Sequence, residues 1–379
     1  MTEAAKQLSG RDREPLVLTP MMLMAPRPDG VEAIWAVSRT SLGRVESATA
    51  DGRRQMHACD PHGFTPQGDA ILRVRVAGFA PGAAGRLRPI TTAADDGETV
   101  TGAWKPFRTL NPAARTTRFV VWNDTHRHDE TIGQLHRVTP AADFLVWNGD
   151  TCNNWDDAAE LIPTLLCPGG CDISAGRPVC LLWGNHDVRG PHAFRMPTMV
   201  ATPEGRPFYA FRSGPVAVIC LHTGEDKPDD HPSFHGRAAF DALRKEQAAW
   251  LAEVIRRPEM RTAPYRVVLC HLPLRWTDEG PQDYAGDGYD RFSAGSRALW
   301  HDLLVAWRTQ VVISGHTHRS TWIPPTADWP YGQLVGGGPE LERASWIEGT
   351  ADGSVLRLCQ RNLAGGILHD LNFSPLPPG

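Results

Sequence analysis

Five short apolar runs in this 379-residue chain each end in residues that can bind a metal ion, and this pattern restricts the possible folds most strongly. The central run, Phe144 to Asn148, is followed directly by Gly149 and Asp150. A short, wholly apolar run is typical of a buried parallel strand, and the ligands of open α/β sheets lie at the carboxyl ends of such strands. We therefore expect Asp150 at the edge of a sheet, as the carboxylate shared by two metal ions.

The other four runs repeat this arrangement along the chain. Their ends carry Asn123-Asp124-Thr125-His126, Gly184-Asn185-His186-Asp187, Cys270-His271 and Gly315-His316-Thr317-His318. Any one of these groups can occur by chance, but five in order, each after an apolar strand, form a strong pattern. Carboxylates and neutral imidazoles are the ligands that suit Fe, Mn, Zn or Co. The sequence therefore predicts a transition-metal site where several strands end.

The segment that carries these groups alternates strands with helices. We expect strands at Phe119–Trp122, Phe144–Trp147, Val179–Trp183, Val267–Cys270 and Val311–Ser314, and a hairpin of Phe208–Arg212 with Val216–His222. Helices are expected at Glu130–Val138, Asp156–Leu166, Arg237–Arg256 and Ser296–Trp307. Such alternation predicts a layered α/β domain, here over residues 116–375. Antiparallel strands from Leu334 onward are expected to complete its sheet.

Residues 16–112 have a different texture. They lack a helical period and contain short alternating stretches separated by Pro and Gly, which read as strands. These stretches are Val31–Val37, Gly43–Ser47, Ile71–Val76 and Gly102–Phe107. An all-β antiparallel sandwich over residues 16–112 fits this pattern. The chain is therefore expected to have two domains, joined by a linker near residues 111–117.

Charge and hydropathy limit the possible partners. The net charge is −4 and the Lys and Arg residues are scattered, so we expect no nucleic-acid partner and no anionic membrane surface. The opening segment from Met1 to Glu14 is polar, and no later run approaches the roughly 20 apolar residues that span a bilayer. We expect a soluble, cytoplasmic protein.

Cys180, Cys220 and Cys270 lie in apolar runs, where a thiol acts as a small hydrophobe, so reduced cysteines are expected. The oligomeric state is left open.

The five groups resemble the signature of the calcineurin-like metallophosphoesterases: D-x-H, G-D, G-N-H-[DE], H and G-H-x-H, in this order. The resemblance implies a four-layer α/β/β/α domain with two divalent or mixed-valence transition-metal ions, Fe, Mn or Zn. It places one metal on Asp124, His126, Asp150 and His318, and the second on Asp150, Asn185, His271 and His316. Asp150 bridges the ions, and a hydroxide shared between them is the expected nucleophile.

Two residues of the third group are expected to act in catalysis. His186 follows a metal ligand without being assigned to metal, and its expected role is to protonate the leaving oxygen. Asp187 is expected to accept a hydrogen bond from one ring nitrogen and so fix the tautomer and orientation of His186. The alternative for His186 is a purely structural, hydrogen-bonded histidine.

Four further residues are candidates for binding substrate. Arg189 can meet a phosphate oxygen in a bidentate way, against the alternative of an ordinary surface arginine. Asn153 and Asn154 can donate hydrogen bonds to phosphate, against the alternative of helix N-caps. His222 ends an apolar strand and is a candidate for lining the substrate cleft. The polar loops Glu225–His235 and Trp276–Arg291 are expected to form a lid or a pocket wall.

The N-terminal segment, from Leu18-Thr19-Pro20 to Phe107-Arg108-Thr109, resembles the fibronectin-III-like domain of purple acid phosphatase-type proteins, with any small β-sandwich as the alternative. That family has D-x-G in the first group and a tyrosine three residues after the bridging Asp. This chain has His126 and Asn153 instead. No iron-tyrosinate centre is therefore expected.

The expected function is that of a dinuclear metal-dependent phosphohydrolase, a phosphatase or phosphodiesterase, acting on a small phosphate mono- or diester. One alternative is a nuclease of the same superfamily, which the acidic balance and the absence of a basic, aromatic-interleaved groove disfavour. Another is a catalytically silent binding scaffold of the same fold. Loss of metal ligands would mark such a scaffold, and none is lost in this sequence.

Overall fold

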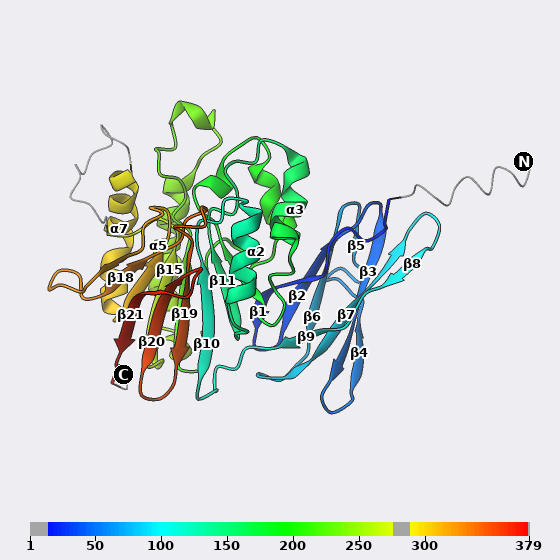
Figure 1. The fold of residues 1–379 in the computed structure, drawn as a ribbon, viewed down its shortest axis with the longest axis horizontal. Helices are drawn as coiled ribbons and strands as arrows, with labels where there is room; N and C mark the ends of the chain where they lie inside the picture. Colours follow the sequence, from blue (N-terminus) through cyan, green and yellow to red (C-terminus); the bar gives the residue numbers. More distant parts are fainter. Residues whose placement is uncertain (1–13, 276–288, 378–379) are drawn as a thin grey trace, which may run out of the picture.

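A nine-stranded sheet runs through the middle of the computed structural model, which describes residues 14–275 and 289–377 (Figure 1). In spatial order its strands are β21 (Ile367–Phe373), β20 (Leu356–Asn362), β19 (Ser345–Ala351), β10 (Thr117–Trp122), β11 (Phe144–Asn148), β12 (Val179–Leu182), β1 (Met22–Arg27), β2 (Gly30–Ala36) and β6 (Ile71–Ala77). β10, β11 and β12 are parallel, with Phe119 opposite Phe144 and Leu145 opposite Val179. Their carboxyl ends therefore meet at one edge.

A second sheet contains the other strands that lead to predicted ligands. Its order is β13 (Tyr209–Ser213), β14 (Val216–Leu221), β15 (Tyr265–Cys270), β16 (Val311–Ser314), β18 (Gly332–Val335) and β17 (Thr321–Ile323). β13 and β14 form the predicted hairpin, whereas β14, β15, β16 and β18 are parallel. The prediction that Leu334 and Val335 belong to an antiparallel strand was wrong for the pair with β16, because β18 follows a crossover and lies parallel to it.

The two sheets pack face to face and helices cover their outer faces. In β10, Val120 and Trp122 point into a core with α2 (Asp129–Val138) and α3 (Leu161–Leu166), while Phe119 and Val121 point into the core between the sheets. This follows from the alternation of side chains along a strand. On the far face, α5 (Phe240–Val254) and α7 (Tyr289–Ala306) cover the second sheet. The order of layers is helices, sheet, sheet, helices.

Shorter helices lie mostly in the loops between these elements. The predicted helix Asp156–Leu166 consists of a 3₁₀ turn followed by α3. The short elements are η1 (Ala158–Glu160), η2 (Pro168–Gly170), η3 (His186–Val188), η4 (Ala193–Arg195), α4 (Met196–Met199), η5 (Pro232–Phe234) and α6 (Pro258–Arg261).

The N-terminal segment contributes a third sheet. It contains β4 (Arg54–His57), β3 (Ser41–Thr49), β7 (Ala84–Ala93) and β8 (Thr99–Thr101), with β5 (Gln67–Gly68) paired to β3 and β9 (Lys105–Arg108) paired to β7. Trp35 and Leu72 of the large sheet pack against Val45 and Leu87 of this third sheet in one apolar core. The N-terminal strands lie at the end of the molecule away from α7 (Figure 1).

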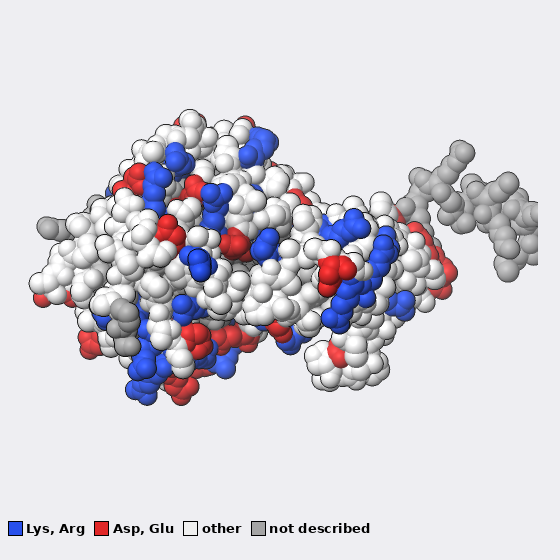
Figure 2. Space-filling view, turned by 90° about the horizontal axis from the view of Figure 1, so that it is seen from below, with Lys and Arg blue, Asp and Glu red and all other residues white. Residues whose placement is uncertain are grey.

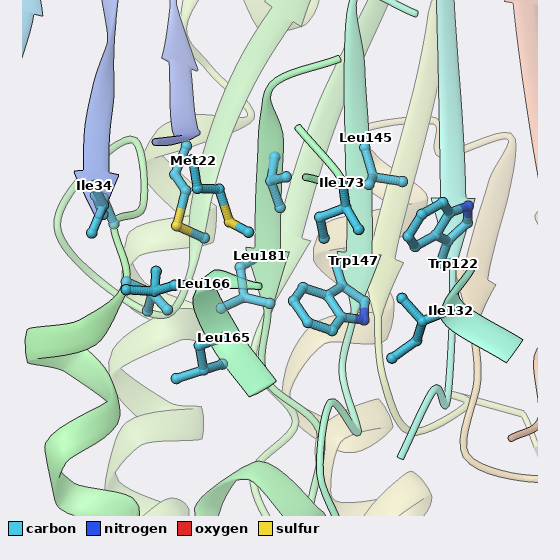
Figure 3. Close-up of a cluster of buried hydrophobic side chains, with 14 of the residues drawn as sticks. Met22, Ile34, Trp122, Ile132, Leu145, Trp147, Leu165, Leu166, Ile173 and Leu181 are labelled. Atoms are coloured by element: carbon cyan, nitrogen blue, oxygen red, sulfur yellow. The ribbon is translucent and has the colours of Figure 1, made fainter. Parts of the chain in front are cut away.

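Strand β1, which was not predicted, joins the N-terminal segment to the rest of the chain. It pairs in parallel with β12, with Met24 opposite Val179. Met22 and Ile34 lie in the same core as Leu166 and Leu181 (Figure 3). β1, β2 and β6 continue the large sheet, so this sheet crosses the expected boundary between the two domains. The separate sandwich and the domain limits 16–112 and 116–375 stay predictions.

On the face drawn in Figure 2, acidic and basic side chains are interspersed over the part of the molecule that lies away from the N-terminal strands. None of the helices within residues 14–275 and 289–377 combines the length and the apolar composition of a membrane-spanning segment. All eight cysteines are free thiols.

Candidate metal centre

The predicted ligands meet where the parallel strands of both sheets end. Among the described residues, ligand atoms of Asp124, His126 and His318 lie within 4.8 Å of one another, and those of Asp150, His271 and His316 do the same. The first group follows β10 and β16, and the second follows β11, β15 and β16. Loops far apart in the sequence thus form two adjacent ligand groups.

Asp150 belongs to the second group and also lies close to the first. Its Oδ2 is 3.4 Å from Nε2 of His126 and 3.1 Å from Nε2 of His271. Its Oδ1 accepts a hydrogen bond of 2.9 Å from the backbone N–H of His186. One carboxylate oxygen is therefore within reach of both groups, while the other is held by the loop after β12.

Hydrogen bonds on the outer nitrogens set the direction of two imidazoles. Nδ1 of His271 lies 2.9 Å from the carbonyl oxygen of Asn148, and Nδ1 of His126 lies 2.8 Å from Oδ1 of Asn153. Because these oxygens accept, each Nδ1 carries a proton, and each Nε2 is the nitrogen that would be available to bind a metal ion. Both Nε2 atoms face Asp150, as a metal ligand would.

Asn185 lies next to the second group. Its Oδ1 is 2.9 Å from Nδ1 of His316. The side chain of Asn185 is 1% exposed. An amide oxygen and an imidazole nitrogen at this separation can share one cation.

The backbone at the ligands has an uncommon conformation. Asp124, His126, Asp150, His316 and His318 all have φ between 44° and 71°. Residues other than glycine seldom adopt this region, and where they do, the strain concentrates at functional sites. The five predicted ligands in this conformation indicate that the fold holds these loops in place for a function.

Glycines next to the ligands allow close approach of the loops. A Cβ on Gly184 would lie 2.2 Å from Oδ1 of Asp150, and a Cβ on Gly315 would lie 2.3 Å from Oδ2 of Asp124. Any side chain at these positions would displace a predicted ligand. Gly184 and Gly315 are therefore required by packing against these carboxylates.

The electrostatics of the centre favour the binding of a cation. Burial raises the pKa of Asp124 to about 8, and the charge of Asp150 adds to this rise. Burial lowers the pKa of His271, but Asp150 and Asp124 outweigh this effect and raise it to about 10. The pKa of Asp150 is lowered instead, because the effect of burial is outweighed by His271, so the two neighbouring carboxylates resist being ionised at the same time. A bound cation would remove this penalty.

The residues present fit transition-metal ions. Among the described residues, the buried Oδ2 of Asp124 has no hydrogen-bond partner, although buried polar atoms are nearly always paired. Asp124 is a predicted ligand, and the donor set of imidazole, carboxylate and amide oxygen suits Fe, Mn or Zn. A metal ion would supply the missing partner.

A family model of the calcineurin-like phosphoesterases matches residues 117–320, which is more than half of the chain. The chain belongs to this family. The comparison with curated proteins found no match.

Two solved structures share the fold of this phosphoesterase. Purple acid phosphatase PPD1 from yellow lupin (Lupinus luteus) seeds has a TM-score of 0.70 and 14% identity, and the match covers 94% of this chain and 75% of that one. PhoD has a TM-score of 0.64 and 12% identity, with 96% and 90% covered. At these identities the likeness shows the fold alone.

His186 lies at the edge of the phosphoesterase centre. Together with His126 and Asp150 it forms a third group of close ligand atoms. Its Nδ1 is 2.5 Å from the carbonyl oxygen of Asn153. This carbonyl oxygen, rather than Asp187, orients the ring.

Asp187 does not make the predicted hydrogen bond to His186. It is completely buried, and its Oδ1 accepts from the N–H and hydroxyl of Thr151 while its Oδ2 accepts from the N–H of Gly184. Burial raises the pKa of Asp187 to about 6, although these hydrogen bonds oppose the rise. Because its oxygens are taken by the loops after β11 and β12, Asp187 ties those loops together.

Arg189 is paired with two carboxylates. Its Nε is 2.6 Å from Oε1 of Glu225, and its Nη2 is 2.7 Å from Oδ1 of Asp226. Its Nη1 lies 3.2 Å from Nε2 of His186. The guanidinium thus lies beside His186, and Glu225 and Asp226 already engage two of its three nitrogens.

The other substrate-binding candidates occupy different settings. Asn153 is exposed and its Oδ1 orients His126, while Asn154 is half-buried and donates to Asp156 over 3.4 Å. Neither caps a helix, since the cap of η1 is Asp157.

His222 does not line an open cleft. It is 1% exposed, and its ring lies edge-on to those of Trp183 and Phe240. Burial lowers its pKa to about 3. The second predicted lid loop, Trp276–Arg291, lies mostly outside the described residues.

Two contributors to the site were missed from the sequence. Asn148 donates through Nδ2 to Oδ1 of Asn123 and to the carbonyl oxygen of Cys270, and so links the ends of β10, β11 and β15. Glu225 holds Arg189 beside His186. Asn148 is a polar residue at the end of an apolar strand, and this pattern could have indicated its role from the sequence. Glu225 could not have been found in this way, because its partner Arg189 lies 36 positions away.

Proposed function

We propose that the protein is a dinuclear metal-dependent phosphohydrolase that cleaves a small phosphate mono- or diester. The observation that carries the proposal is the position of Asp150 Oδ2, which is 3.4 Å from His126 Nε2 and 3.1 Å from His271 Nε2. A carboxylate oxygen shared by two imidazole-containing groups is the arrangement that a bridged pair of ions requires.

Each metal has a full set of ligands in this proposal. Asp124, His126, Asp150 and His318 would hold the first ion, and Asp150, Asn185, His271 and His316 would hold the second. When bound, such ions act as Lewis acids on phosphate oxygens and lower the pKa of a water molecule. The chain itself excludes bulk water from the carboxylates, since Asp124 and Asp150 are at most 1% exposed.

His186 would supply the proton for the leaving group. Its Nδ1 faces the carbonyl oxygen of Asn153, which keeps a proton on Nδ1 and leaves Nε2 to exchange the other one. A water molecule releases one proton to solvent as its oxygen bonds to phosphorus. As the ester P–O bond breaks, the departing oxygen takes the proton from Nε2 of His186, and solvent returns a proton to this nitrogen. A positioned acid of this kind contributes about 10²- to 10⁴-fold in rate.

The test is hydrolysis by the full-length protein loaded with Mn, Fe or Zn. Phosphate mono- and diesters with good and poor leaving groups are compared at several pH values. We expect metal-dependent turnover that is lost in His271→Ala. In His186→Ala, esters with poor leaving groups should slow by about 10²-fold or more, and those with good leaving groups far less.

A matched control is His128→Ala, since His128 is exposed and its side chain caps no helix. Metal binding without turnover of any ester would support the binding-scaffold alternative instead. An equal loss across the leaving-group series in His186→Ala would contradict the role of His186.

A further inference from the structure

A small cavity opens beside Arg189. Its volume is about 220 Å³, and its walls come from the loops after β11 and β12 and from the segment before α5. Arg189 lines this cavity while its Nη1 lies 3.2 Å from Nε2 of His186. The cavity is therefore next to the histidine that faces the metal groups. Pockets for whole ligands measure roughly 300–1,000 Å³, so this one suits one part of a substrate.

The wall contributed by residues 225–240 is fixed at several points. Glu225 and Asp226 pair with Arg189, and Arg244 donates to the carbonyl oxygen of Glu225 over 2.8 Å. Asp229 accepts hydrogen bonds from the N–H groups of Phe240 and Asp241 at the start of α5. The predicted pocket wall Glu225–His235 is thus an ordered part of the site.

The lining of the cavity combines apolar surface with a cation. Phe234, which is 7% exposed, Phe240 and Pro191 supply the apolar part. The charge of Arg189 is balanced by its two carboxylates. Arg237 lines the same cavity and is exposed, and within the described residues no carboxylate pairs with it. Asp156, on the opposite wall, accepts from Asn154.

We infer that this cavity receives the leaving group of the ester, and that Arg237 binds an anionic substituent on it. The inference rests on the proposed function, because His186 must protonate the departing oxygen at the mouth of the cavity. As the ester P–O bond breaks, the alcohol leaves with the proton from His186 and occupies the space between Phe234, Phe240 and Arg237. The substrate class is a phosphate ester of an apolar or aromatic alcohol that carries a carboxylate or a further anionic group.

The test compares 4-carboxyphenyl phosphate with phenyl phosphate on the metal-loaded, full-length protein. The wild type should prefer the carboxylated ester in kcat/KM. Arg237→Gln should reduce this preference by about threefold to tenfold, mainly through KM, as expected for a partly exposed charge-assisted contact. The control Arg256→Gln removes an exposed arginine near the end of α5 and should keep the preference.

Binding of the product alcohol, 4-hydroxybenzoate, provides a readout that needs no turnover. Calorimetry should show weaker binding to Arg237→Gln than to Arg256→Gln. If both esters are hydrolysed and the preference is the same in the two variants, the leaving-group assignment is overturned while the phosphohydrolase remains. If no ester is hydrolysed but 4-hydroxybenzoate binds with dependence on Arg237, the cavity stands as an anion site and the proposed function fails.

Discussion

Replacing Asp187 separates its observed role from the predicted one. Asp187→Ala removes the acceptor for the backbone N–H groups of Thr151 and Gly184, which are bonded to it over 2.9 and 2.8 Å. Both residues are buried, and each stranded buried donor costs about 1–3 kcal/mol. We therefore expect Asp187→Ala to lower the free energy of unfolding by about 2–6 kcal/mol, a large part of a typical stability of about 5–15 kcal/mol.

The assay is urea unfolding followed by tryptophan fluorescence, together with metal titration of the folded protein. Asp187→Asn should lose about half as much stability, since its amide keeps one acceptor. The control Asp157→Ala removes an exposed cap of η1 and should cost about 1 kcal/mol or less. If Asp187→Ala unfolds like the wild type but slows esters with poor leaving groups, then Asp187 acts on His186 and the reasoning is refuted.

Three other changes test separate features. A Cβ on Gly184 would lie 2.2 Å from Oδ1 of Asp150, so Gly184→Ala should weaken both metals by about tenfold or more in a titration. As a control, Gly133→Ala in α2 adds a Cβ that would lie 3.6 Å from its nearest neighbouring atom. It should leave metal affinity unchanged and add up to about 1 kcal/mol of stability. Equal metal affinities in Gly184→Ala and Gly133→Ala would contradict the packing argument. Removal of residues 1–112 takes Met22 and Ile34 out of a shared core and should yield aggregates by size-exclusion chromatography; a monodisperse, metal-binding chain would show that β1 is dispensable. Burial lowers the pKa of His57 to about 4, so below pH 6.5 the unfolded chain binds a proton that the folded chain does not, and stability falls as the pH drops toward 4. His57→Gln should reduce the loss of unfolding free energy between pH 7 and 5 by about 1 kcal/mol. An unaltered pH profile of stability would contradict this role of His57.

Much of the candidate metal centre could be predicted from the sequence, because each residue proposed as a ligand comes just after an apolar strand. Parallel strands bring their carboxyl ends to one edge, so the position of Asp150 follows from local sequence. The same logic predicts that Asn185 and His271 lie at strand ends. The candidate ligand residues are thus encoded in short motifs.

The rest depended on contacts between distant segments. β1 is short, has no clear alternation and pairs with β12 over 150 positions away, so no local pattern indicates it. Asp187 and Arg189 follow a ligand motif, yet their partners are Thr151 and Glu225 on other loops. His222 ends a strand as the ligands do, but Trp183 and Phe240 enclose it. Side-chain partners of this kind are set by tertiary packing, which spacing does not report.

The most direct test of the bridged metal pair is the metal content of Asp150→Asn. Wild-type and variant proteins are loaded with Mn or Zn, dialysed, and measured for metal per chain by mass spectrometry of the elements, with Asp157→Asn as a surface control. Because Oδ2 of Asp150 is near both His126 and His271, we predict about two metals per chain in the wild type and the control, and loss of both in Asp150→Asn. Two tightly held metals in Asp150→Asn, or loss of one alone, would contradict the bridging assignment.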